Sequence, residues 1–151
     1  MSEDFARNAA RIRAAVAEQG FTKHLGAELE NLEEGFCVLS LARKPELMQQ
    51  HGFFHGGVTA YLVDNATTIA AGTMCKEGRA PLTAGFTLNF LSPAVGDKLI
   101  CRAKVVKPGK ALSVVNAEVF SLIDGKEKQT ATALATIAIV EGSLLKIGGT
   151  K

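Results

Sequence analysis

The segment from Gly56 to Gly72 constrains the fold more than any other part of this sequence. It reads GGVTAYLVDNATTIAAG, whose residue types suit a helix, and Asp64 carries its only charge. Apolar side chains occupy all of its faces, and a helix without a polar face belongs in the interior of a protein. A large element must therefore cover its apolar residues, which are Val58, Leu62, Ala66, Ile69 and Ala70.

Strands flank this helix in sufficient number to cover it. The later ones are joined by short turns, Pro108-Gly109-Lys110 and Asp124-Gly125, so they form an antiparallel meander. The most economical arrangement is an α+β fold in which one twisted antiparallel sheet curls around the central helix. The strands are expected at residues 28–41 (two strands, broken at 33–35), 83–91, 98–107, 111–122 and 127–140.

The strand at residues 83–91 has the clearest alternation of side chains. Strict alternation places Phe86, Leu88 and Phe90 on one face of the sheet. It places Thr83 with Gly85 on the other face. We therefore expect Thr83 to point away from the side that carries Phe86.

A helix from about residue 4 to residue 19 precedes the strands, because apolar residues recur there at the spacing of one helical face. Ser2 is placed to cap this helix and Gly20 to end it. The length of 151 residues suits one domain. We divide the chain into an N-terminal helix and lead-in (1–22), a domain of sheet and central helix (23–141) and a loose C-terminal tail (142–151).

Composition excludes several classes of protein. The chain has 17 Lys and Arg against 15 Asp and Glu, and a net charge of +2 is too small to bind nucleic acid by charge alone. No run reaches the ~18 apolar residues of a membrane helix, and the N-terminus lacks the apolar core of a secretion signal. We expect a cytoplasmic protein without nucleic-acid or membrane partners. Its cysteines are expected as buried, reduced thiols rather than disulfides or zinc ligands: Cys37, Cys75 and Cys101.

Two glycines open the central helix, where backbone N–H groups have no intrahelical partners. At Gly56 and Gly57 these donors combine with the positive end of the helix dipole, and the missing Cβ lets a carbonyl approach closely. Such a terminus can accept an anion or a developing oxyanion. Glycine pairs also start helices for structural reasons alone, so both interpretations stay open.

Asp64 is the second candidate, because a carboxylate inside an apolar helix is costly unless it is paired or partly solvated. No cation lies at helical spacing, and Tyr61, Thr67 and Thr68 offer only hydroxyls. Asp64 is then either a structural carboxylate bonded to Thr68 or a base or nucleophile held in a cleft. Thr68 is a candidate site residue in both cases.

Three segments resemble one family, the hotdog-fold acyl-CoA thioesterases of the phenylacetate-degradation (PaaI-like) type. They are QQHGFFHGGVTAYLVD at residues 49–64, TLNFLSPA at 87–94 and VKPGK at 106–110. The resemblance covers about residues 20–140. It implies a hotdog fold and a thioesterase that hydrolyses acyl-CoA to a free acid and CoA. It implies no metal and no cofactor other than the CoA of the substrate.

The resemblance also implies roles for individual residues. The N–H of Gly56 would polarise the thioester carbonyl, and Asp64 would attack it or activate water. His55 would orient the substrate sulfur or carbonyl. Gln49 and Thr83 would hold the lytic water.

The CoA site and the assembly follow from the same resemblance. It implies a homodimer that pairs into a homotetramer, and a CoA site along residues 90–95 and 107–112, which includes Phe90, Lys107, Gly109 and Lys110. Two other functions stay open. A hotdog dehydratase acting on a 3-hydroxyacyl thioester needs a second acid–base residue, which we do not find at a suitable spacing. A non-catalytic acyl-CoA-binding sensor needs an output module, and no helix-turn-helix segment is visible.

Helix geometry adds a constraint on the assembly. Gly56 and Asp64 are eight residues apart, which is about 12 Å along a helix axis. One carbonyl cannot meet both groups, because an oxyanion donor and a nucleophile must each lie about 3 Å from it. We therefore expect each active site to combine Gly56 of one subunit with Asp64 of another.

Overall fold

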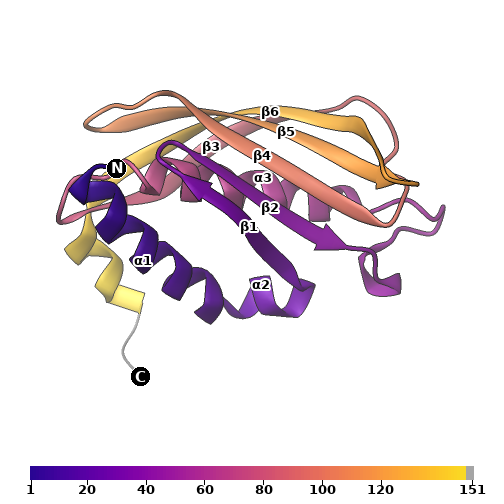
Figure 1. Ribbon diagram of the computed structural model, residues 1–151, viewed down its shortest axis with the longest axis horizontal. Coiled ribbons are helices and arrows are strands. Elements are labelled where there is room, and N and C mark those ends of the chain that lie inside the picture. The colour runs from indigo at the N-terminus through magenta and orange to yellow at the C-terminus, as the bar shows by residue number, and fades with distance from the viewer. Residues whose placement is uncertain (149–151) are drawn as a thin grey trace.

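The computed structural model describes residues 1–148, and a single antiparallel sheet dominates it (Figure 1). The sheet has six strands in the order β1-β2-β4-β5-β6-β3. Consecutive strands β4, β5 and β6 form the expected meander, while β3 pairs with β6 at one edge. The strands are β1 (Ala27–Glu33), β2 (Phe36–Ala42), β3 (Arg79–Phe90), β4 (Lys98–Lys107), β5 (Leu112–Ile123) and β6 (Lys126–Glu141).

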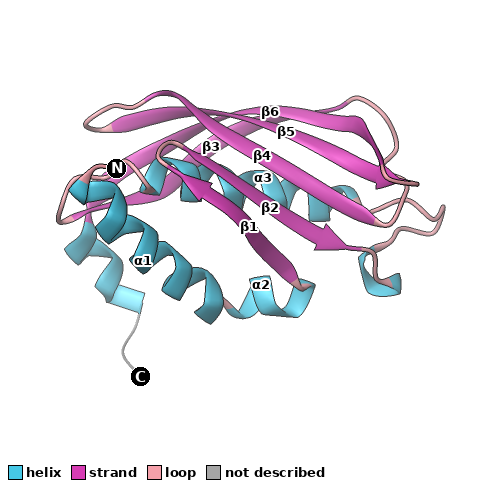
Figure 2. Cartoon of the chain, viewed as in Figure 1, coloured by secondary structure: helices cyan, strands magenta, loops and turns pink. Residues whose placement is uncertain are grey.

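The central helix α3 (Gly56–Gly72) lies against the inner face of this sheet. Its five apolar residues expected to be covered are all at most 7% exposed. The other helices lie on the same side of the sheet as α3, and within residues 1–148 the outer face of the sheet carries none (Figure 2). The expected α+β architecture, a sheet curled around one long helix, is confirmed.

Small side chains on the sheet make room for α3. The inner faces of β5 and β6 carry alanines that are at most 4% exposed: Ala117, Ala131, Ala133 and Ala135. Side chains of this size allow the helix to pack close to the backbone of the sheet. Leucines on β2 and β4, among them Leu39 and Leu99, fill the remaining interior and are 0% exposed.

The N-terminal segment forms two helices where one was expected. Helix α1 (Glu3–Glu18) is capped by Ser2, whose Oγ accepts the N–H of Phe5 at 3.1 Å, as predicted. The prediction that Gly20 ends the helix is wrong. The break is at Gln19, and Gly20 begins a short helix, α2 (Gly20–Leu25).

Two other expectations need correction at the ends of elements. Strand β3 begins at Arg79, four residues earlier than predicted, and pairs there with the end of β6. The tail was expected to be loose, but residues 142–148 form a 3₁₀ segment, η2 (Gly142–Gly148). Residues 149–151 of the predicted tail lie outside the described residues. Among residues 1–148, no helix is long and apolar enough to cross a membrane.

The three cysteines are free thiols in the interior, as predicted. Burial raises the pKa of Cys37 to about 12 and raises the pKa values of Cys75 and Cys101 as well. A thiol reacts as its thiolate, so these side chains are inert near neutral pH.

Candidate active site

The N-terminus of α3 presents one unpaired backbone donor. His55 is the N-cap residue: its Nδ1 accepts the N–H of Gly57 at 2.9 Å, and its carbonyl accepts the N–H of Val58 at 2.9 Å. The N–H of Gly56 has no hydrogen-bond partner among residues 1–148. Because Nδ1 is an acceptor, the proton of a neutral His55 ring is on Nε2, which is free to donate.

Gly56 lies under an aromatic ring. A Cβ added at this position would meet Cζ of Phe90 at 3.2 Å, so the close approach of the ring favours glycine. Gln49 and Phe53 help to line a cavity of about 480 Å³ here, which we call the Gly56 cavity. The structure therefore brings together three of the predicted site residues: Gln49, Gly56 and Phe90.

Asp64 accepts a hydrogen bond from β3, a strand at the edge of the sheet. Thr83 Oγ1 donates to its Oδ1 at 2.7 Å, and Thr68 Oγ1 lies 2.7 Å from Thr83 Oγ1. Thr83 has one hydroxyl proton and gives it to the carboxylate, so Thr68 must be the donor to Thr83. No ion pair to Asp64 forms within the described part of the chain.

Two details of this chain correct the sequence predictions. Thr68 does not bond Asp64 directly but through Thr83. Thr83 was expected on the face opposite Phe86, yet it lies opposite Ile137, a residue of the inner face that is 0% exposed. The register shifts between Thr83 and Gly85, and this bulge interrupts the alternation. Thr83 consequently points inward, toward α3.

A second cavity, of about 550 Å³, surrounds Asp64, and we call it the Asp64 cavity. Aromatic rings from three elements line it: Phe21, Tyr61 and Phe86. Phe21 packs edge-on against Tyr61, with ring centroids 5.2 Å apart. Phe21 belongs to α2, so the unpredicted helix supplies part of this wall.

A hydrogen-bonded cluster ties α1 and α2 to α3 beside Asp64. Thr22 Oγ1 donates to Oε1 of Gln19 at 2.7 Å and lies 2.6 Å from the Tyr61 hydroxyl. Asn65 Nδ2 donates to Gln19 at 3.1 Å and to Tyr61 at 3.0 Å. Sequence reasoning missed Gln19, Thr22 and Asn65, although an asparagine next to Asp64 in an apolar helix was the available signal.

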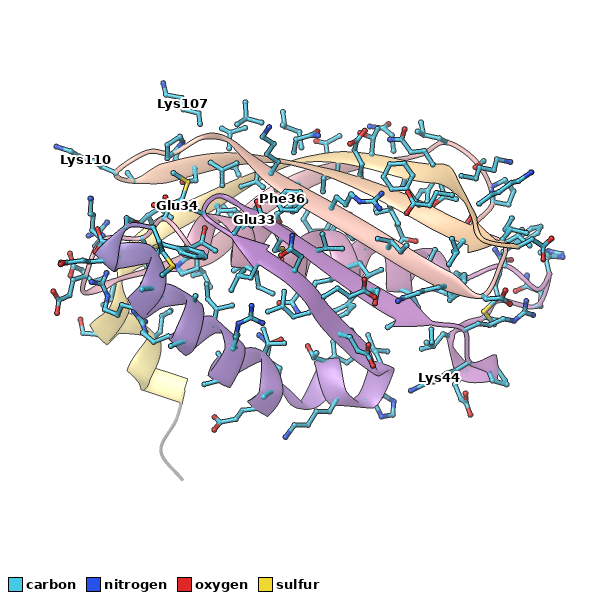
Figure 3. All side chains as sticks on the ribbon, in the orientation of Figure 1. Glu33, Glu34, Phe36, Lys44, Lys107 and Lys110 are labelled. Atoms are coloured by element: carbon cyan, nitrogen blue, oxygen red, sulfur yellow. The ribbon has the colours of Figure 1, made fainter. Side chains whose placement is uncertain are left out.

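The predicted CoA-binding turn lies away from both of these groups. Gly109 and Lys110 line a cavity of about 610 Å³ with Ala71 and Met74, at the C-terminal end of α3. Lys107 and Lys110 extend outward from the β4–β5 turn (Figure 3). A Cβ on Gly109 would lie 2.0 Å from the carbonyl oxygen of Leu112, so this tight turn requires glycine. The predicted site residues thus occupy three places on one chain.

Comparisons with known proteins agree on one family. Residues 51–128 match the family model described as "Thioesterase superfamily". The chain is 30% identical over 129 residues to acyl-coenzyme A thioesterase PaaI of Escherichia coli, with 85% of this chain and 83% of that protein covered. It is 30% identical over 118 residues to human acyl-coenzyme A thioesterase 13, with coverage of 76% and 83%. A crystal structure of a thioesterase family protein from Silicibacter pomeroyi superimposes with a TM-score of 0.87 at 38% identity, covering 89% of this chain and 99% of that one.

Proposed function

The chain belongs to the thioesterase superfamily, and from this membership we propose that it hydrolyses an acyl-CoA thioester to a free carboxylic acid and CoA. The observation that carries the proposal is that α3 offers both a free backbone donor at its N-terminus and a carboxylate two turns further on. The N–H of Gly56 stabilises the oxyanion that forms at the thioester carbonyl. Asp64, oriented by Thr83, attacks that carbonyl or activates water.

Each active site is shared between two subunits. Gly56 and Asp64 of one chain line different cavities and are about 12 Å apart along α3. Two α3 helices running antiparallel across a twofold axis would bring Gly56 of one subunit to Asp64 of the other. A dimer then has two equivalent sites.

Strand β3 is the contact surface that we propose for this dimer. It is an outermost strand of the sheet, and it carries Phe86 and Phe90, which are 37% and 59% exposed. An exposed edge strand with apolar side chains readily pairs with another chain. Pairing of two such dimers gives the homotetramer that the sequence resemblance implies. Analytical ultracentrifugation tests both steps, and a fully active monomer would contradict them.

The activity is tested by incubating the purified protein with a panel of acyl-CoAs and a thiol reagent. We expect free CoA to be released. The Asp64→Asn variant should keep its fold and lose most of kcat, because the amide is neither a nucleophile nor a base. Hydration of an enoyl-CoA without release of CoA would instead indicate a dehydratase. Binding without turnover would indicate a sensor, and normal turnover by Asp64→Asn would exclude that carboxylate.

Lys107 and Lys110 bind the phosphates of CoA in this proposal. Both side chains are exposed and lie three residues apart on one turn. Replacing both with alanine should raise KM for acyl-CoA more than KM for a thioester that lacks the nucleotide, since these charges meet only phosphates. Equal increases for the two substrates would remove the lysines from the CoA site.

A further inference from the structure

We propose that a cavity between α1, α3 and β3 binds the acyl group, and that the substrate class is a medium-length aliphatic acyl chain. This inference rests on the proposed thioesterase function and names the part of the substrate that the function leaves open. The cavity, which we call the α1 cavity, has a volume of about 360 Å³. Pockets of this size hold small apolar ligands.

Aliphatic residues form much of the wall of the α1 cavity, and the polar side chains of Asn8, Arg11, Gln19, Asn65, Thr68 and Arg79 complete it. Ile12, Ala15 and Val16 line it from α1, Ile69 and Gly72 from α3, and Pro81 from β3. None of the lining side chains that the structure describes is aromatic. The surface therefore offers dispersion contacts to a flexible chain rather than ring stacking to an aromatic group.

Several polar groups around the cavity already have partners. Asn8 donates to the carbonyls of Thr73 and Cys75, at 3.2 and 2.7 Å. Arg79 forms an ion pair with Glu141 at 2.6 Å. Because Asn8 and Arg79 are satisfied within the protein, an alkyl chain in the cavity leaves their partners in place. Arg11, which also lines the cavity, is exposed and keeps its contact with water.

The α1 cavity adjoins the Asp64 cavity and shares lining residues with it. Thr68 lines it and donates to Thr83, which donates to Asp64. Gln19 and Asn65, bonded to each other at 3.1 Å, line both the α1 cavity and the Asp64 cavity. A chain attached to a carbonyl at Asp64 thus passes Asn65 and continues along α3 toward Gly72, a path of about 12 Å.

Gly72 lies on this path where α1 and β3 come close to α3. A Cβ there would lie 3.1 Å from Cγ of Pro81 and 3.5 Å from Cδ1 of Ile12. The absence of a side chain lets β3 and α1 approach α3 closely, which narrows the cavity at this point. We expect this narrowing to limit the length of the chain.

The test is the dependence of kcat/KM on chain length, measured with acetyl-, hexanoyl-, decanoyl- and palmitoyl-CoA. For the wild type we expect kcat/KM to rise by about fourfold per methylene, the factor that corresponds to about 0.8 kcal/mol for each buried methylene, and then to level off. Ala15→Phe fills the cavity from an exposed helix position. It should lower the ratio of decanoyl to acetyl turnover by at least about tenfold, the loss of roughly two buried methylenes.

Two further variants complete the design. Ala14→Phe adds the same ring at the adjacent exposed position, which does not line the cavity, and should leave the ratio unchanged. Ile12→Ala enlarges the cavity and should move the preference toward palmitoyl-CoA. A flat chain-length profile, or equal ratios for Ala15→Phe and Ala14→Phe, would overturn the inference while leaving the thioesterase intact. Failure to hydrolyse any acyl-CoA would instead overturn the proposed function.

Discussion

Asp64 takes part in a chain of hydroxyl donors that leaves one of its oxygens available. Thr68 donates to Thr83 and Thr83 to Oδ1, so this chain uses one face of the carboxylate. Oδ2 has no hydrogen-bond partner within the described residues. The two threonines therefore position Asp64, while Oδ2 is the oxygen that can meet substrate or water.

Removing the Thr83 hydroxyl should slow turnover without preventing folding. We expect Thr83→Val, which has nearly the same shape, to lower kcat by about tenfold or more, because a hydrogen bond to a charged group contributes about 1.5–3 kcal/mol. KM should change little. Thr83→Ser keeps the hydroxyl, so this control variant should have a kcat near that of the wild type. If Thr83→Ser were as slow as Thr83→Val, Thr83 would act through packing rather than through its hydroxyl.

The buried thiols should make the protein less stable at alkaline pH. Burial raises the pKa of Cys37 from 9.0 to about 12, so the folded protein keeps a proton that the unfolded chain releases. This contribution is fully present below the unfolded pKa and is lost as pH rises from about 9 toward 12. The free energy of unfolding should fall by up to about 1.4 kcal/mol per pH unit for this thiol. Urea denaturation at several pH values measures the slope, and Cys37→Ala should reduce it.

At the scale of elements, the start of α3 combines a structural cap with the proposed oxyanion donor. His55 Nδ1 satisfies Gly57 and leaves Gly56 unpaired. His55 therefore both caps α3 and leaves the N–H of Gly56 free for a substrate oxygen.

Substitution of His55 can separate these two roles. His55→Ala should destabilise the protein by about 1 kcal/mol, because it removes the N-cap acceptor. His55→Asn supplies a side-chain oxygen to Gly57 and should retain most of that stability while losing the imidazole. Urea denaturation and kcat are measured on both variants. A kcat that falls equally in both would show that the ring itself acts on substrate, and full activity of the Asn variant would limit His55 to capping.

Most elements were predictable because their patterns are strong and local. The apolar run of α3 and the turns between β4, β5 and β6 are evident from residue types. Gly56 and Asp64 stand out as candidate site residues for the same reason. The inward direction of Thr83 was not predictable, because the bulge after it arises from pairing with β6 and leaves no mark in the alternation. Helix α2 was missed because a glycine that commonly ends a helix begins this one.

At the scale of the whole molecule, the proposed shared site predicts complementation between inactive variants. Asp64→Ala and Gly56→Val should each be inactive alone, the second because its side chain occupies the place of the carbonyl. After complete subunit exchange, half of the dimers are mixed, and each mixed dimer has one intact site. Activity should return to about a quarter of the wild-type value if the sites are independent.

This experiment needs proof that subunits exchange and a control in which they cannot. Differently tagged subunits, purified together, establish that mixed dimers have formed. Mixed dimers without activity would contradict a site shared across subunits, as would recovery when exchange is blocked by cross-linking before mixing.

The N–H that Gly56 leaves unpaired belongs to the main chain, and every amino acid except proline carries the same group. Substitution of residue 56 therefore keeps the donor, whereas a single substitution of Asp64 removes the carboxylate. A mutation at position 56 changes the space beside the donor, because any Cβ there meets the Phe90 ring at 3.2 Å. Genetic selection on this chain would therefore register the donor only as a demand for glycine, because a side chain at position 56 meets the Phe90 ring and occupies the place of the substrate carbonyl.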